Sequence, residues 1–213
     1  MPALIHLVRH AEGLHNLRHN VQIPDAPLSE RGFNQAELLG QKFLSAHSDS
    51  VGAVISSPLR RSIQTSLTAF RRVLHADQYP ANTSVGVRPG VWLGLDPALR
   101  EFGGGLPCNT GSPVSELMSE FPTLHQLQQL DPDWFDDSGR DPSSAGRIKQ
   151  EILGRLEQMQ ADLQEDPDRT DIVVVTHDGI IGALAPGIRI ELGQWKSFEL
   201  VKASNGMLSL QPV

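Results

Sequence analysis

The sequence has one cysteine, Cys108, among its 213 residues, and it lacks any long apolar run. A single cysteine excludes an internal disulfide framework and is typical of a reducing compartment. No apolar segment approaches the roughly 20 residues that a membrane-spanning helix requires. The first residues also lack the apolar core and cleavage site of a secretory signal, because Arg9 and His10 interrupt them early. We therefore expect a cytoplasmic protein without a membrane partner.

Positive charge is scarce as well, since the formal net charge is −7 at pH 7. This balance argues against nucleic acid or an anionic membrane as the main partner. It is compatible with a small anionic ligand, because a few arginines dominate the field within a Debye length of about 8 Å. Hydrophobic residues make up 39% of the chain, enough for a buried core. The length favours one domain that spans residues 1–213, and no pattern specifies an oligomeric state.

Apolar runs alternate with helical patterns along most of the chain. The runs at residues 3–8, 51–55 and 172–176 are apolar almost throughout, as the buried strands of a parallel sheet are. Helices are expected from Ser29 as N-cap, with Pro58 in the first turn, over residues 144–165, and over residues 179–184. This alternation predicts an α/β fold: a three-layer sandwich with a mostly parallel central sheet flanked by helices.

Residues 75–142 break this alternation. The stretch holds most of the prolines, two of the three tryptophans and only short apolar segments. We expect it to leave the sheet and to form a small cap insertion of short helices and loops over the ligand site. Near the C-terminus, residues 198–201 and 207–210 are expected to pair as edge strands.

Two of the predicted strands are each followed closely by a histidine. The run at residues 3–8 is followed by Arg9 and His10, and the run at residues 172–176 is followed by His177. Parallel strands bring such residues to one edge of the sheet, where open α/β sheets bind their ligands. Arg61, in the helix after the second strand, belongs to the same edge. Two guanidinium groups suit the bidentate recognition of phosphate, so we expect an anion pocket.

The residue types in this pocket suit phosphoryl transfer. A neutral imidazole, that of His10, can attack phosphorus while an imidazolium at His177 and the two arginines hold the phosphoryl oxygens. Such a reaction needs no metal ion, but it needs a proton donor for the leaving group. Glu101 is the candidate, because it precedes a run of glycines that allow close approach of the backbone.

Five ordered segments carry a family resemblance. They are Val8-Arg9-His10-Ala11-Glu12 with Asn16, residues 27–32 with Gln35-Ala36, Ser57-Pro58-Leu59-Arg60-Arg61 with Gln64-Thr65, Leu99-Arg100-Glu101, and Val175-Thr176-His177-Asp178-Gly179. Together they resemble the histidine phosphatase superfamily, in its phosphoglycerate mutase-like branch. Residues 107–112 and 120–122 are in addition similar to its fungal and plant phosphatase-like members.

The resemblance implies a role for each matching residue. His10 becomes phosphohistidine, Arg9, Arg61 and His177 bind the phosphoryl group, and Glu101 acts first as acid and then as base. Asn16 falls where the family places a polar loop residue on phosphate, and Arg60 would project elsewhere.

Asp178 departs from the family pattern, which often has glycine after the second histidine. Three roles are open for its carboxylate: it repels a dianion, it orients His177, or it serves as an alternative acid. We place it among the substrate-binding candidates for this reason.

Other histidines invite a different interpretation. His6, His15 and His19 are numerous enough for a metal site, but they lack the i, i+4 spacing or the cysteine partners of common zinc sites. We therefore expect no metal and no cofactor. His15 is expected to line the substrate entrance instead.

These observations favour a metal-independent phosphomonoesterase that acts on a small organic phosphate through a phosphohistidine at His10. The small cap argues against a mutase, because mutase activity requires a cap that excludes water. Two alternatives remain. The pocket is used for a non-phosphate hydrolysis, elimination or isomerisation, or the protein is a phosphate-binding regulatory protein with little turnover.

Overall fold

A six-stranded sheet forms the centre of the computed structural model, which describes residues 3–74, 91–103, 105–136, 142–163 and 168–213. The strand order is β3-β2-β4-β1-β5-β6. The strands are β1 (Leu4–Arg9), β2 (Val51–Ser56), β3 (Leu93–Leu95), β4 (Asp171–Thr176), β5 (Trp195–Lys202) and β6 (Leu208–Pro212). Strands β3, β2, β4 and β1 run parallel, while β5 is antiparallel to both β1 and β6.

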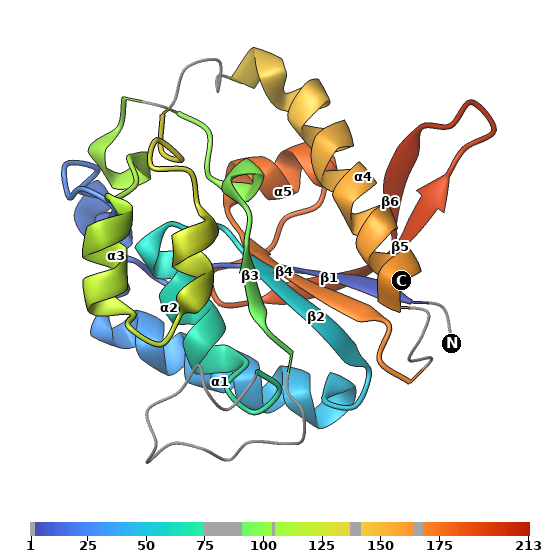
Figure 1. Ribbon diagram of the computed structural model, residues 1–213, viewed down its shortest axis with the longest axis horizontal. Helices are drawn as coiled ribbons and strands as arrows, with labels where there is room; N and C mark the ends of the chain where they lie inside the picture. The colour runs from blue at the N-terminus through green and yellow to red at the C-terminus, as the bar shows by residue number, and fades with distance from the viewer. Residues whose placement is uncertain (1–2, 75–90, 104, 137–141, 164–167) are drawn as a thin grey trace.

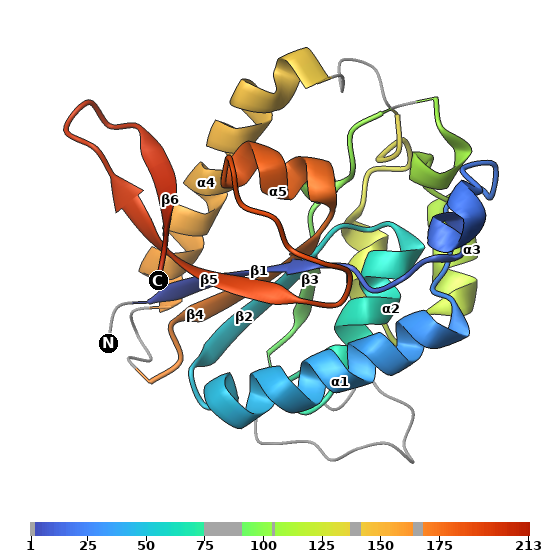
Figure 2. The same cartoon turned by 180° about the vertical axis from the view of Figure 1, so that it is seen from behind.

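Helices cover both faces of the sheet (Figures 1 and 2). The helices α1 (Glu30–His47) and α2 (Arg60–Ala69) lie on one face, and α4 (Ala145–Asp162) and α5 (Asp178–Leu184) lie on the other. Each face has its own buried apolar cluster, one around Phe43 and Ile63, the other around Ile152 and Ile181. Full burial of such side chains stabilises the fold by about 1.5–3 kcal/mol each. The predicted three-layer sandwich is confirmed.

Two helix starts test the predictions made from sequence. Ser29 caps α1 as expected, because its hydroxyl oxygen accepts a hydrogen bond from the Gly32 N–H at 3.0 Å. Pro58 lies just before α2 and not in its first turn, since the N-cap is Leu59. The chain stays in the sheet for one more residue, where the Ser57 N–H donates to the Val175 carbonyl, and Pro58 then forms the turn.

The predicted cap insertion is partly wrong. Leu93–Leu95 forms β3, the edge strand of the sheet, paired in parallel with β2. Three residues with a glycine at their centre are too short to show a strand period, which explains the error. The insertion otherwise forms the short helices η3 (Pro97–Leu99), η4 (Pro107–Asn109), α3 (Val114–Glu120) and η5 (His125–Gln129), as expected. Residues 75–90 and 137–141 of it lie outside the described residues.

The insertion is anchored to the sheet by apolar side chains. Leu117, Leu127 and Trp134 are at most 4% exposed and belong to the same cluster as Phe43. At the other end of the sheet, β5 lies between β1 and β6, so that of the two expected edge strands only β6 is at the edge among the described strands. Within the described residues, no helix combines the length and the apolar content that crossing a membrane requires.

Candidate active site

The site is built where β1 and β4 end side by side. Arg9 and Thr176 are partners in the parallel register, and the next residues along the two strands are His10 and His177. The His10 N–H donates to the Thr176 carbonyl at 2.9 Å, which continues the ladder by one bond. The centroids of the two imidazole rings are 4.9 Å apart. The structure therefore brings together the two histidines that the sequence placed at one edge.

The hydrogen bonds of His10 fix its tautomer. Its side chain is buried, and Nδ1 lies 2.7 Å from the carbonyl oxygen of Ala11. Because a carbonyl oxygen only accepts, Nδ1 carries the proton and Nε2 carries the lone pair. Burial, together with the positive charge of Arg61, lowers the pKa of His10 well below its usual value. His10 is therefore a neutral imidazole whose Nε2 keeps its lone pair.

Arg61 is buried, and most of its hydrogen bonds go to acceptors of the protein. It is 1% exposed, and Nη1 donates to the Cys108 carbonyl at 2.6 Å. Nη2 donates to Oδ1 of Asn109 at 3.0 Å and to Nδ1 of His177 at 3.2 Å. Its Nε is buried and has no hydrogen-bond partner among the described residues. The protein thus holds three of the five guanidinium N–H groups, and the buried Nε–H is among those left for a ligand.

His177 differs from its expected imidazolium form. Because a guanidinium only donates, Nδ1 of His177 accepts from Arg61. Nε2 lies 2.9 Å from Oγ of Ser57 and 3.3 Å from Oγ of Ser62, both of which can accept its proton. In this arrangement Nδ1 of His177 therefore carries no proton. In this geometry His177 orients Arg61.

Asp178 pairs with the other arginine of the pocket. Its Oδ1 lies 3.0 Å from Nη1 of Arg9, which also donates to the Ile190 carbonyl at 3.1 Å. The Asp178 side chain is 57% exposed, so it lies at the rim. Of the three roles that the sequence left open, the structure shows none directly and adds a fourth: the carboxylate holds Arg9 in place.

Glu101 lies against the first turn of α5. Its Oε1 accepts from the Phe102 N–H at 2.9 Å, and its Oε2 accepts from the Gly179 N–H at 3.1 Å. Burial raises the pKa of Glu101, although both N–H donors favour the carboxylate. A Cβ atom on Gly179 would collide with Oε1 of Glu101. Glycine at this position therefore lets the acid approach the helix that follows His177.

His15 and Asn16 lie in the short helix η1 (Leu14–His19) beside His10. The rings of His15 and His10 are 5.7 Å apart, and burial, Arg61 and Arg9 lower the pKa of His15 to about 4. Asn16 accepts a hydrogen bond from the Gly13 N–H at 2.9 Å through its Oδ1. In this structure Asn16 thus closes the turn at the start of η1, and its contact with phosphate remains a prediction.

The pocket contains buried side-chain nitrogens without hydrogen-bond partners, two of which are arginine donors. Nε of Arg9, Nε of Arg61 and Nδ1 of His15 are buried and lack a partner among the described residues. A buried polar group without a partner costs about 1–3 kcal/mol. An anion with several acceptor oxygens removes this cost at more than one of these atoms. The arrangement is therefore suited to a phosphoryl group next to Nε2 of His10.

Sequence reasoning missed the residues that hold Arg61 and His177. Ser57 and Ser62 flank the Pro-Leu-Arg-Arg run, and their spacing around it is a usable signal because the first directly follows β2 and the second lies in the first turn of α2. Asn109 lies in the segment 107–112 that carried part of the resemblance, but the sequence assigned it no role. It accepts from Arg61 and donates through Nδ2 to the Phe102 carbonyl at 2.9 Å, which connects Arg61 to the backbone beside Glu101. Only the folded insertion makes this link.

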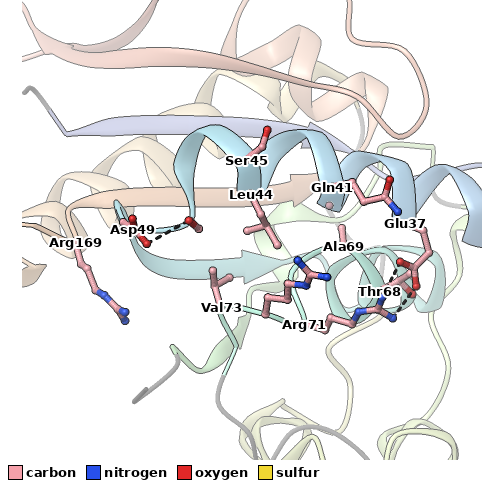
Figure 3. Close-up of a pocket in the computed structure, with 13 residues that line it drawn as sticks. Glu37, Gln41, Leu44, Ser45, Asp49, Thr68, Ala69, Arg71, Val73 and Arg169 are labelled. Atoms are coloured by element: carbon pink, nitrogen blue, oxygen red, sulfur yellow. Dashed lines mark hydrogen bonds and ion pairs between the residues drawn. The ribbon is translucent and has the colours of Figure 1, made fainter. Parts of the chain in front are cut away.

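Two neighbouring features lie outside the site. Arg60 projects away from it, as expected, and its Nε lies 2.9 Å from Oε2 of Glu120. A pocket between α1 and α2, which Figure 3 shows with the Glu37–Arg71 ion pair at its wall, is lined by none of the predicted site residues.

The three histidines that the sequence analysis considered for a metal site, His6, His15 and His19, do not form a cluster. Among the described residues, His6 instead groups with His47 and Asp171.

Comparisons with known proteins agree with this fold. A model of the histidine phosphatase superfamily (branch 1) matches residues 5–212. A phosphoglycerate mutase-like protein of Arabidopsis thaliana is 34% identical over 141 residues, which are 56% of this chain and 52% of that protein. Phosphoserine phosphatase 1 of Hydrogenobacter thermophilus is 23% identical over 207 residues, or 96% of this chain and 85% of that protein.

A solved structure extends the likeness. A mycobacterial glucosyl-3-phosphoglycerate phosphatase, solved in complex with VO3, is 17% identical with a TM-score of 0.62, over 99% of this chain and 97% of that one. At this level of identity the likeness concerns the fold. The family model, in contrast, spans nearly the whole chain, including the segments that carry His10, Arg61, Glu101 and His177. The chain belongs to the histidine phosphatase superfamily, branch 1.

Proposed function

We propose that the protein is a phosphomonoesterase that hydrolyses a small organic phosphate through a phosphohistidine at His10. The observation that carries this proposal is the state of His10, whose proton is on Nδ1 and whose Nε2 lies in a pocket of arginine donors. A neutral imidazole surrounded by cations is poorly suited to bind a proton and well suited to attack an anion. Relatives named as phosphatases support a phosphate ester as the substrate class.

In the first step, Nε2 of His10 attacks phosphorus and the ester P–O bond breaks. Arg9 and Arg61 hold the phosphoryl oxygens as their charge redistributes, so positive charge is supplied without a metal ion. Glu101 gives its proton to the leaving oxygen. Its raised pKa supports this role, because a buried carboxyl group stays protonated to a higher pH than an exposed one.

In the second step, water attacks the phosphorus of phosphohistidine and the P–N bond breaks. The Glu101 carboxylate takes a proton from this water, which restores the acid for the next cycle. Inorganic phosphate leaves and His10 returns to its neutral form. Hydrolysis is favoured over transfer to a second alcohol, because transfer requires a cover that excludes water and the described part of the insertion consists only of short helices and one short strand.

The test is hydrolysis of an aryl phosphate by wild type and His10→Ala, with His125→Ala as the matched control. His125 is an exposed histidine in η5, so its loss removes an imidazole without touching the site. We expect His10→Ala to lower kcat by at least about a thousandfold, because it removes the nucleophile. We expect wild-type activity to be inhibited by vanadate and unaffected by a chelator.

Phosphoenzyme trapping completes the test. Wild type quenched with denaturant during turnover of a ³²P-labelled ester should retain acid-labile, base-stable label, whereas His10→Ala should retain none. Equal turnover by the two proteins would refute the proposal. Turnover without label would refute the phosphohistidine and leave the phosphatase.

A second candidate function is supported by the Asp178–Arg9 ion pair, which places a carboxylate where phosphate would otherwise meet Arg9. Such a pocket could bind phosphate with little turnover, or act on a substrate without phosphate. Calorimetric binding of vanadate without hydrolysis of any ester would favour the regulatory protein. Activity that is indifferent to both vanadate and phosphate would favour a non-phosphate substrate.

A further inference from the structure

A second cluster of histidine and carboxylate side chains lies at the opposite edge of the sheet, where β1 and β4 begin. His6 is in the first half of β1, Asp171 is the first residue of β4, and His47 is the last residue of α1. Each offers one donor atom, and these atoms all lie within 4.8 Å of one another. The proposed phosphatase chemistry uses none of the three.

His6 and Asp171 are oriented by hydrogen bonds behind the donor atoms. His6 is completely buried, and its Nδ1 lies 2.9 Å from Oγ of Ser197. Its Nε2 lies 3.2 Å from Oδ2 of Asp171, whose Oδ1 accepts from the Leu4 N–H at 2.8 Å. Metal-binding histidines are usually held in this way by a partner on the second ring nitrogen. One nitrogen and one oxygen are therefore fixed and face each other.

His47 brings the third donor from a different element. Its ring lies 4.5 Å from the ring of His6 and 4.9 Å from that of Phe43, which packs on both histidines. It is partly exposed at the end of α1, so an ion reaches the cluster from solvent past this residue.

We propose that His6, His47 and Asp171 bind one divalent transition-metal ion, for which Zn²⁺ has the best-matched chemistry. Two imidazole nitrogens and one carboxylate oxygen are an established zinc donor set, with water as the fourth ligand. Ligand atoms about 2.0–2.2 Å from a tetrahedral ion lie about 3.4 Å apart. The donor atoms here lie within 4.8 Å of one another, so the three side chains must draw together to bind the ion. The ion would join β1, β4 and α1 and stabilise the fold at the edge remote from His10.

The site escaped sequence analysis for a simple reason. Its ligands are separated by 41 and 124 positions, from His6 to His47 and from His47 to Asp171, and no local spacing connects them. The expectation of no metal rested on His6, His15 and His19, which the fold does not gather. The inference is independent of the proposed function, because it concerns stability rather than turnover.

The test is titration of chelator-treated protein with Zn²⁺ in a calorimeter and with Co²⁺ in a spectrophotometer, since tetrahedral Co²⁺ gives a visible absorption band. We expect one ion per chain with a dissociation constant of about 1 µM or tighter. We expect His47→Gln to weaken binding at least tenfold and to abolish the rise in Tm that Zn²⁺ causes in the wild type. His125→Gln is the matched control and His10→Ala excludes the active site; both should bind like the wild type.

The proposal is overturned if the wild type shows no 1:1 binding, if His47→Gln binds as tightly as the wild type, or if His10→Ala alone loses the ion. Circular dichroism checks that His47→Gln is folded, which its position at a helix end favours. Should it fail to fold, Ser197→Ala takes its place. That variant removes the partner of Nδ1 of His6, and we expect it to bind Co²⁺ about tenfold more weakly; unchanged binding would then overturn the proposal.

Discussion

The two ends of the β1–β4 strand pair both present histidines, but their neighbours give these histidines opposite characters. At the carboxyl ends, His10 and His177 face arginines, and the pocket has donors without partners. At the amino ends, His6 faces the Asp171 carboxylate. Although burial acts to raise it, hydrogen bonds from His6 and Ser50 hold the pKa of Asp171 below its usual value. One end is thus suited to an anion and the other to a cation.

This contrast shows that residue type alone does not decide what a histidine does. The imidazoles of His6 and His10 are four residues apart, and both are buried. The charge of the facing group differs, and in a buried setting that charge outweighs the intrinsic properties of the ring. Four substitutions test this explanation at the carboxyl end.

The largest effect is expected from Arg61→Lys, which keeps the charge but removes the planar fork. A lysine cannot donate to Asn109, to the Cys108 carbonyl and to a phosphoryl oxygen with the geometry of a guanidinium. We expect kcat/KM for an aryl phosphate to fall by about a thousandfold. Arg60→Lys is the matched control, because Arg60 pairs with Glu116, Glu120 and Asp25 and with none of the proposed catalytic residues, and it should stay within about twofold. Similar losses in both variants would show that the fork is unimportant.

Glu101→Gln tests the proton donor through its pH dependence. Glu101 acts while protonated, below its raised pKa, whereas His10 acts while neutral, above its lowered pKa. Activity that depends on both therefore falls as pH rises through the pKa of Glu101. We expect Glu101→Gln to lose about a hundredfold on an alkyl phosphate and to lose this alkaline fall.

The comparison of leaving groups makes this test specific. On p-nitrophenyl phosphate, whose leaving group needs little protonation, the loss should be clearly smaller. The substrate ionises in the same way with both enzymes, so the ratio of wild-type to variant rates at each pH removes its contribution from the pH profile. The same loss on both substrates, with unchanged profiles, would assign Glu101 a structural role.

Gly179→Ala tests the packing between Glu101 and α5. The added methyl group would collide with Oε1 of Glu101 and press on the Phe102 ring, so the carboxyl group must move. We expect about a tenfold loss of kcat, because a displaced acid transfers its proton less efficiently. Gly182→Ala in the same helix meets no atom within 4 Å and should keep wild-type kcat. A loss in both variants would point to the helix rather than to the acid.

The smallest effect is expected from Asp178→Asn. Asp178 resembles Asp171 at the amino end, because each sets a carboxylate beside a nitrogen-bearing side chain of β1. Its removal leaves Arg9 without this carboxylate partner, so the pocket at the carboxyl ends of the strands should become more favourable for an anion. Because the pair is partly exposed, we expect the inhibition constant for vanadate to fall only about two- to fivefold, and less at high salt. Weaker vanadate binding would mean that Asp178 is needed to position Arg9.

The fold could be predicted from the sequence where local patterns are strong. Three strands, β1, β2 and β4, were predicted from their apolar runs, and the start of α1 was predicted from its cap at Ser29. The alternation of strands and helices then predicted the three layers. The strand β3 was missed because its three residues carry too little periodic signal. The convergence of His10 and His177 followed from the parallel sheet, since strands that pair in parallel end at the same edge.

What the sequence determined by itself was which side chains arrive at the edge of the sheet where β1 and β4 end, because each follows a strand or lies near the start of a helix at a recognisable position. The tertiary structure decided how those side chains are held: the proton on Nδ1 of His10, the enclosure of Arg61 by Asn109 and the Cys108 carbonyl, and the pairing of Arg9 with Asp178. It also decided the meeting of His6, His47 and Asp171. These contacts join residues from separate elements, and their geometry exists only once the layers have packed.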